Sequence, residues 1–112
     1  MAGTNVIELT AANWQQEVEQ SDLPVMVDFW AVWCGWCRHL APAVEHIADQ
    51  FAGRVKVGKL DTDDNQAIAV QYGIDNLPQV LFFKGGAQPR ERVVGAVPEQ
   101  ELVNILNRVL AS

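Results

Sequence analysis

Hydrophobic and polar positions alternate along this chain with two different periods, which predict strands in some segments and helices in others. Residues 5–9 alternate apolar and polar side chains, as a half-buried strand does. Residues 24–31 are almost continuously apolar, which is typical of a strand covered on both faces. Further strands are predicted at 54–61, 79–84 and 91–94. Because only a turn separates the last two, we expect them to form an antiparallel hairpin.

Four segments between or after these strands have helical spacing, at residues 11–20, 34–51, 65–72 and 98–110. Thr10 is placed to cap the first of them, with Trp14 and Val18 on one face. Strands that alternate with helices predict an α/β fold. The chain has 112 residues, so we expect a single domain, 1–112, with a core of its own.

The predicted helix 34–51 contains the two cysteines of the chain, within the stretch WCGWC (33–37). Apolar residues recur along this helix at spacings of three and four, and Cys37 begins that buried stripe. Pro42 lies inside the helix and should bend it. Cys34 lies at the first turn, where backbone N–H groups are free and point outward. We therefore expect Cys34 to be accessible and Cys37 to be shielded.

The cysteine pair allows three interpretations. A purely structural disulfide is disfavoured, because a loop this short contributes only about 2 kcal/mol by the chain-entropy relation. A zinc site is disfavoured because His39 lies about 200° around the helix from Cys37, and His46 is more than two turns away. The third interpretation is a redox pair, in which the two cysteines take different roles because their positions on the helix differ. The helix N-terminus would favour the thiolate of Cys34 as nucleophile, and Cys37 would resolve the mixed disulfide.

Asp28 interrupts the apolar segment 24–31 just before the turn that carries the cysteines. A carboxylate in a strand covered on both faces is costly unless it is neutral or has a partner. We interpret it as a buried carboxyl with a raised pKa that exchanges a proton with the Cys37 thiol. Lys59, in the strand 54–61, is its candidate charge partner. The alternative is a bulge or a strand edge that brings Asp28 to water.

The charge of the chain argues against partners that are themselves strongly anionic. The net charge is −6, and residues 1–37 contain acidic but no basic side chains, so a basic surface for nucleic acid or anionic lipid is not expected. No apolar segment approaches the roughly 20 residues of a membrane span. The first basic residue is Arg38, so a signal peptide is not predicted. We expect a cytoplasmic protein whose partners are proteins or small molecules.

Beyond these features, the chain resembles the thioredoxin family over about residues 5–110. The similarity lies in the stretches VDFWAVWCGWC, LAPAVEHIADQF, KLDTDDN, YGIDNLP, LFFKGG and VVGAVP. It implies a thioredoxin fold, in which a central mixed five-stranded sheet carries four helices on both faces. It also implies a thiol–disulfide oxidoreductase that reduces protein disulfides. By position, Cys34 resembles the nucleophile and Cys37 the resolving thiol, while Asp28 and Lys59 resemble the buried acid and its lysine.

The resemblance further implies a substrate groove in which the backbone of Leu77 pairs with an extended peptide. Pro78 corresponds to the cis-proline of the family, although an ordinary trans bond is the alternative. The implied substrate-binding residues are Trp33, Gly35, Trp36, Ile74, Leu77, Pro78, Gly95 and Ala96. The implied partners are disulfide-containing proteins as substrates and a thioredoxin reductase as electron donor. No cofactor or metal is expected, and the protein should be a monomer.

Two positions depart from the pattern of the family. Trp36 replaces the proline of WCGPC, and Gln79 replaces the threonine that commonly follows the cis-proline. Proline would fix φ and remove an N–H, so Trp36 should stabilise the reduced form, make the disulfide more oxidising and narrow the choice of partners. The alternative is a surface side chain with little effect. A more oxidising or isomerase-like variant and a non-catalytic binding module are therefore the rival functions.

Overall fold

The computed structural model describes residues 5–112, so residues 1–4 of the predicted domain lie outside the description. A single five-stranded sheet has the order β1-β3-β2-β4-β5. Strands β1, β3 and β2 are parallel, whereas β4 runs antiparallel to β2 and β5 antiparallel to β4. The bounds are β1 (Val6–Leu9), β2 (Val25–Trp30), β3 (Lys56–Asp61), β4 (Gln79–Phe83) and β5 (Glu91–Val94). All five predicted strands are confirmed within two residues at each end, and so is the hairpin.

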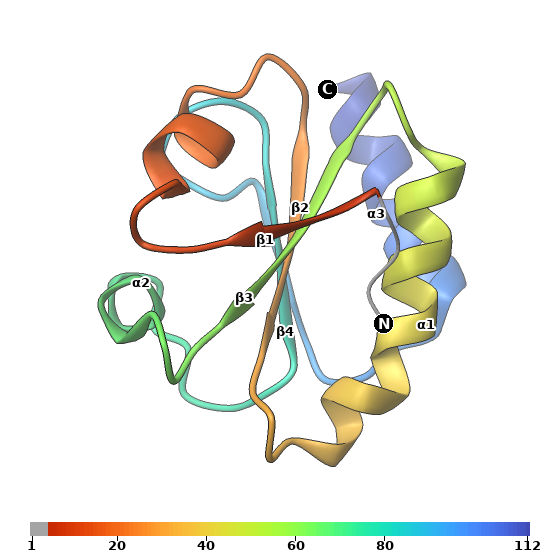
Figure 1. Cartoon of the computed structure of the whole chain (residues 1–112). Coiled ribbons are helices and arrows are strands. Elements are labelled where there is room, and N and C mark those ends of the chain that lie inside the picture. Colours follow the sequence, from red (N-terminus) through yellow and green to blue (C-terminus); the bar gives the residue numbers. More distant parts are fainter. Residues whose placement is uncertain (1–4) are drawn as a thin grey trace.

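Helices cover both faces of this sheet, as predicted. The long helices α1 (Gly35–Gln50) and α3 (Glu99–Ala111) lie on one face, while α2 (Gln66–Gln71) and the short π-helix η1 (Gln15–Glu19) lie on the other (Figure 1). Helix α1 continues through Pro42, and its bend stays a prediction. Within the described part of the chain, every helix falls short of the length and hydrophobicity that a membrane span requires.

The first helix is shorter than the predicted segment 11–20. A turn precedes it, in which Thr10 Oγ1 accepts a hydrogen bond from the Asn13 N–H (3.2 Å) and Asn13 Oδ1 accepts one from the Thr10 N–H (2.7 Å). Asn13 also donates to the Glu8 carbonyl at 3.0 Å, which holds the turn against β1. Thr10 therefore closes a turn rather than capping a helix that begins at once. Trp14 and Val18 are both buried, as predicted.

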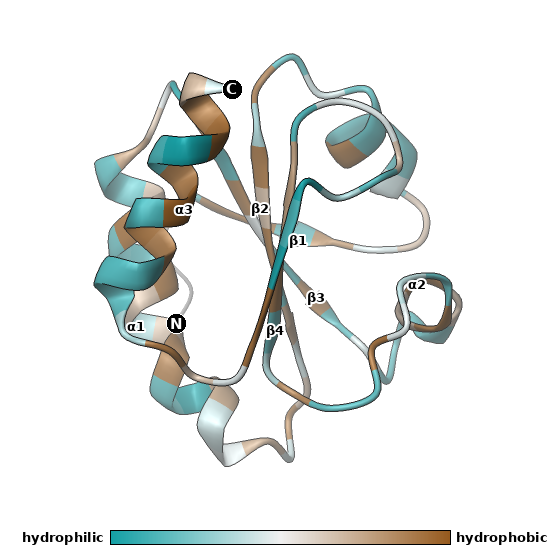
Figure 2. Cartoon of the chain, turned by 180° about the vertical axis from the view of Figure 1, so that it is seen from behind, coloured by the Kyte–Doolittle hydropathy of each residue, from teal (hydrophilic) through white to brown (hydrophobic). Residues whose placement is uncertain are grey.

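Two hydrophobic layers sandwich the central strand β2, whose residues from Val25 to Phe29 are all buried. Met26 packs with apolar side chains of α1 and α3, whereas Val27 and Phe29 pack with those of η1 and α2. Apolar and hydrophilic segments alternate along α1 and α3, as expected for helices with one face on the sheet (Figure 2). Because β2 ends at Trp30, the turn that follows lies at the carboxyl end of this central strand, between the two layers.

Candidate active site

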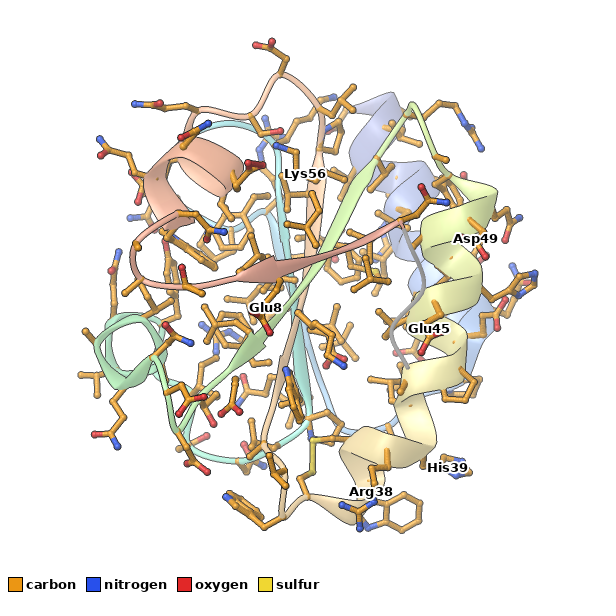
Figure 3. The ribbon with its side chains drawn as sticks, viewed as in Figure 1. Glu8, Arg38, His39, Glu45, Asp49 and Lys56 are labelled. Carbon is orange, nitrogen blue, oxygen red and sulfur yellow. A yellow bond between two sulfur atoms is a disulfide. The ribbon has the colours of Figure 1, made fainter. Side chains whose placement is uncertain are left out.

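The disulfide between Cys34 and Cys37 lies where the chain leaves β2 and enters α1, close to Arg38 (Figure 3). The two Cα atoms are 5.3 Å apart. Cys34 is the N-cap of α1, and its sulfur accepts a hydrogen bond from the Cys37 backbone N–H at 3.2 Å. The sulfur thus occupies the place of the side-chain oxygen that usually caps a helix. When the disulfide opens, this N–H and the helix dipole stabilise negative charge on Cys34.

The predicted difference in exposure between the two cysteines is wrong for the disulfide form. Cys34 is 5% exposed and Cys37 is 3% exposed. Both sulfur atoms pack with Ala31, and Trp30 and Leu77 cover this small cluster. Leu77 comes from a distant segment of the chain, so the helical pattern does not reveal its packing against this cluster. The two cysteines differ instead in their surroundings, because only Cys37 lines the cavity described next.

Asp28 is buried within β2, and its Oδ1 has no hydrogen-bond partner in the described part of the chain. Burial raises the pKa of Asp28 to about 7, and the positive charge of Lys59 opposes that rise. Asp28 pairs in continuous register with Lys59 of β3 and Val80 of β4. The alternative of a bulge or strand edge at this position is therefore wrong.

Lys59 acts on Asp28 through space, since no ion pair joins these two described side chains. Its Nζ lies over the Trp30 ring, 4.4 Å from the centroid, in a cation–π contact. A cavity of about 80 Å³ is lined by residues that include Asp28, Cys37 and Lys59. The buried carboxyl and the Cys37 sulfur thus face one space that is large enough to admit water.

A groove of about 320 Å³ lies beside the disulfide. Its lining consists of Trp36, Leu77, Pro78, Gly95 and Ala96, all of which were predicted at the substrate site. The Leu77–Pro78 peptide bond is cis, which confirms the implied isomer. The Pro78 carbonyl accepts a hydrogen bond from the Gly95 N–H at 2.8 Å, so the turn after β5 is fixed against the segment before β4.

The other predicted site residues take different positions. Trp33 is 68% exposed, and its Nε1 donates to Asp63 Oδ2 at 3.0 Å. Gly35 is the exposed first residue of α1. Ile74 is half-buried and packs against the core layer of η1 and α2 instead of lining the groove.

Gln79 and Arg92 form a polar contact between β4 and β5 that the sequence reasoning missed. Gln79 is 1% exposed, and its Oε1 accepts a hydrogen bond from Arg92 Nη1 at 2.8 Å. The departure of Gln79 from the family pattern was the one sequence feature that pointed to this place. Arg92 gave no such indication, because an arginine in an edge strand usually faces solvent.

Neither histidine forms a metal-binding group with the cysteines among the described residues. Both are exposed, and His46 Nδ1 lies 2.5 Å from Glu99 Oε2 of α3. His39 contacts the edge of the Trp36 ring, with centroids 5.6 Å apart. Among residues 5–112, no group of three His, Cys, Asp or Glu side chains is arranged to hold a metal ion.

Comparison with known proteins gives a consistent result. Residues 5–108 match the family model described as Thioredoxin. The chain is 50% identical to Thioredoxin 1 of Nostoc sp., over 92% of this chain and 95% of that protein. It is 45% identical to Thioredoxin of Porphyra purpurea, over 96% and 99%. Thioredoxin M-type, chloroplastic, of Spinacia oleracea is 42% identical over 95% of this chain, which spans 58% of that longer protein.

Proposed function

Because the chain belongs to the thioredoxin family of protein disulfide oxidoreductases, we propose that Cys34 and Cys37 take unequal roles in its dithiol–disulfide exchange. The observation that carries this assignment is the surroundings of each sulfur. Cys34 accepts the N–H at the start of α1, whereas Cys37 lines the cavity that holds the Asp28 carboxyl. The first position favours a thiolate, and the second favours a thiol that gives up its proton late.

In the first step, the Cys34 thiolate attacks one sulfur of a substrate disulfide. A bond forms between Cys34 and that sulfur, the substrate S–S bond breaks, and the leaving substrate thiolate takes up a proton. In the second step, the Cys37 thiol gives its proton to the Asp28 carboxylate, directly or through water in the cavity. The Cys37 thiolate then attacks Cys34 and forms the intramolecular disulfide, and the second substrate thiolate leaves.

Each cycle passes two electrons to the substrate and leaves the chain oxidised. The pKa of Asp28, raised to about 7 by burial, suits this proton transfer because the carboxyl both accepts and releases a proton near neutral pH. Lys59 opposes the rise in pKa, so it keeps part of the population ionised. We assign Asp28 as the proton acceptor and Lys59 as the residue that adjusts it.

The groove beside the disulfide is the proposed substrate site. Trp36, Leu77, Pro78, Gly95 and Ala96 line it, and its walls are mainly apolar. Trp33 and Gly35 border the cysteines, and Ile74 supports the segment that leads to Leu77. A groove of this kind suits weak binding of many extended peptides through backbone hydrogen bonds.

We propose a thioredoxin reductase as the electron donor. The chain would act in the cytoplasm, where thiol pools keep most disulfides reduced. A single domain and a monomeric state complete the proposal. The net charge of −6 supports the monomer, because like charges oppose self-association.

Mixed-disulfide trapping tests the two roles. Cys37→Ser should accumulate a covalent complex with a disulfide-containing protein through Cys34, because no second thiol is left to resolve it. Cys34→Ser should accumulate none and should lose reductase activity. Complexes are counted by mass spectrometry after acid quenching. Equal trapping by both variants would show that the roles are interchangeable, and full activity of Cys34→Ser would support a binding module.

A further inference from the structure

Gln79 is a buried polar side chain directly after the cis-proline, and all of its polar atoms have partners. Its Nε2 donates to the Asn76 carbonyl oxygen at 3.0 Å, lies 3.0 Å from Asn76 Oδ1, and makes a longer contact of 3.4 Å with Asp75 Oδ1. Its Oε1 accepts from Arg92. The side chain lies on the face of the sheet that also carries Leu81. It therefore connects the segment before the cis-proline to the strand β5.

The bond to the Asn76 carbonyl has a geometric consequence for Leu77. The Asn76 C=O and the Leu77 N–H belong to one planar peptide unit, which is trans, so they point in opposite directions. Gln79 holds the carbonyl from the side of the core. The Leu77 N–H must then point away from the Gln79 amide.

Leu77 also has free hydrogen-bonding capacity. Among the described residues, no hydrogen bond uses its N–H or its C=O. Its side chain lines the groove together with Trp36, next to the disulfide. An N–H and a C=O left free beside a groove are the groups with which an extended peptide pairs.

We propose that Gln79 is a positioning residue for peptide substrates, because its amide fixes the peptide unit that presents the Leu77 N–H to the groove. This inference rests on the proposed function of the groove as the substrate site. The donor function of Gln79 is the essential part, since only its NH₂ group contacts Asn76. The contact with Arg92 uses the opposite end of the amide.

The test compares a substrate that has peptide groups with one that has none. One is a peptide with an intramolecular disulfide, and the other is 2-hydroxyethyl disulfide, which has no peptide groups. Gln79→Met has nearly the size of glutamine but no N–H donor. We expect about a five- to tenfold lower kcat/KM for the peptide, mostly through a higher KM, since a backbone hydrogen bond is misaligned. The rate with 2-hydroxyethyl disulfide should stay within about twofold of the wild-type rate. The reduction potential should equal that of the wild type within experimental error.

Arg92→Met is the matched control. It removes the contact with Oε1 and the hydrogen bond from Arg92 Nη2 to the Tyr72 carbonyl (2.6 Å), and it leaves the bonds to Asn76. The ratio of the two rates should therefore stay near that of the wild type. Gln79→Glu is a second variant, since it keeps an acceptor for Arg92 and lacks the donor, and its ratio should fall as in Gln79→Met. The proposal is overturned if both substrates slow equally, if neither slows, or if Arg92→Met changes the ratio as much. A wild-type chain that reduces neither substrate would instead contradict the proposed function.

Discussion

Trp36 contributes to the site through both its backbone and its side chain. It is 67% exposed, it contacts His39, and it forms a wall of the groove. Its backbone retains an N–H in the first turn of α1, one residue before the Cys37 N–H that donates to the sulfur of Cys34, and a proline at this position would lack that N–H. Comparing a variant that lacks both the N–H and the aromatic ring with one that lacks only the ring separates the two contributions.

The reduction potential should respond to the backbone of residue 36. Trp36→Pro removes a donor near the Cys34 thiolate, so the reduced form loses stability and the potential should fall. A loss of about 0.5–1.5 kcal/mol for one hydrogen bond corresponds to about 10–30 mV for a two-electron couple. The couple is titrated in defined thiol buffers, with the oxidised fraction read by mass spectrometry of alkylated thiols.

Trp36→Ala is the control for this measurement, because it loses the aromatic ring as Trp36→Pro does but keeps the N–H. Its potential should stay close to that of the wild type. If Trp36→Pro also leaves the potential unchanged, the interpretation of Trp36 as a surface side chain with little effect on the redox couple is the correct one.

Individual residues were predictable where their environment is local. The burial of Asp28 follows from its place in a continuous apolar strand, and the position of Cys34 at a helix start follows from the spacing. The low exposure of Cys34 was not predictable from the helical pattern, because its cluster with Ala31 and Cys37 also packs against Leu77, which lies in a remote segment. The position of Lys59 over the Trp30 ring depends on side-chain packing that no periodicity records.

Among the elements, β3 lies between β1 and β2, and its close contact with β1 depends on Gly58. A Cβ atom at Gly58 would lie 2.5 Å from Leu9 Cδ1 and 3.1 Å from the Ile7 carbonyl oxygen. Leu9 is fully buried, so it has little room to move. Gly58→Ala should therefore lower the free energy of unfolding by about 1–3 kcal/mol, as overpacking does.

Urea unfolding of the disulfide form measures this effect. Gly35→Ala is the control for stability, because its added Cβ would have Arg38 Nη2 as its nearest neighbour, at 3.8 Å. That variant should change the free energy of unfolding little, or raise it through the better helix propensity of alanine. A Gly58→Ala chain as stable as the wild type would mean that β1 shifts away from β3 without cost.

The elements themselves were largely predictable, because the periods of two and 3.6 residues are local properties. The exception is the first helix, for which 11–20 was predicted and Gln15–Glu19 is observed. The side chain of Asn13 bonds to the Glu8 carbonyl and the Thr10 N–H in the turn that precedes the helix. Such a bond depends on how the chain turns after β1, so a helical pattern alone does not indicate it.

At the scale of the whole molecule, Asp28 should make stability depend on pH. Burial raises its pKa from 3.8 to about 7, so the folded chain binds a proton that the unfolded chain releases above about pH 4. The stability that this proton provides is fully present below about pH 4 and is lost as the pH rises to about 7. A shift of this size corresponds to a loss on the order of 4 kcal/mol.

Asp28→Asn should remove this dependence. The variant should be more stable than the wild type by a few kcal/mol at about pH 8, and the difference should shrink towards about pH 4. Urea unfolding of both chains at several pH values, in the disulfide form, gives the difference. The change of this difference with pH is the decisive quantity, because the buried amide alters the free energy of unfolding by an amount that does not depend on pH. A difference that is the same at every pH would show that Asp28 titrates normally in the folded chain.

The arrangement of the whole molecule was predictable only in part. Alternating strands and helices predict the α/β class, whereas the mixed five-stranded sheet came from the resemblance, and the strand order β1-β3-β2-β4-β5 was not predicted. The contact between Gln79 and Arg92 joins two strands across the sheet, and neither residue carries a periodicity that identifies its partner. Pairings of this kind depend on the complete fold and not on any one segment.

The groove draws its walls from α1, from the segment before β4 and from the turn after β5. During synthesis on the ribosome, the two cysteines emerge well before Pro78, Gly95 and Ala96. The unfinished chain therefore carries its thiols before it has the walls that select a substrate, and β2 still lacks both neighbouring strands. Substrate selection is acquired late in the life of each molecule, while thiol chemistry is present from an early stage.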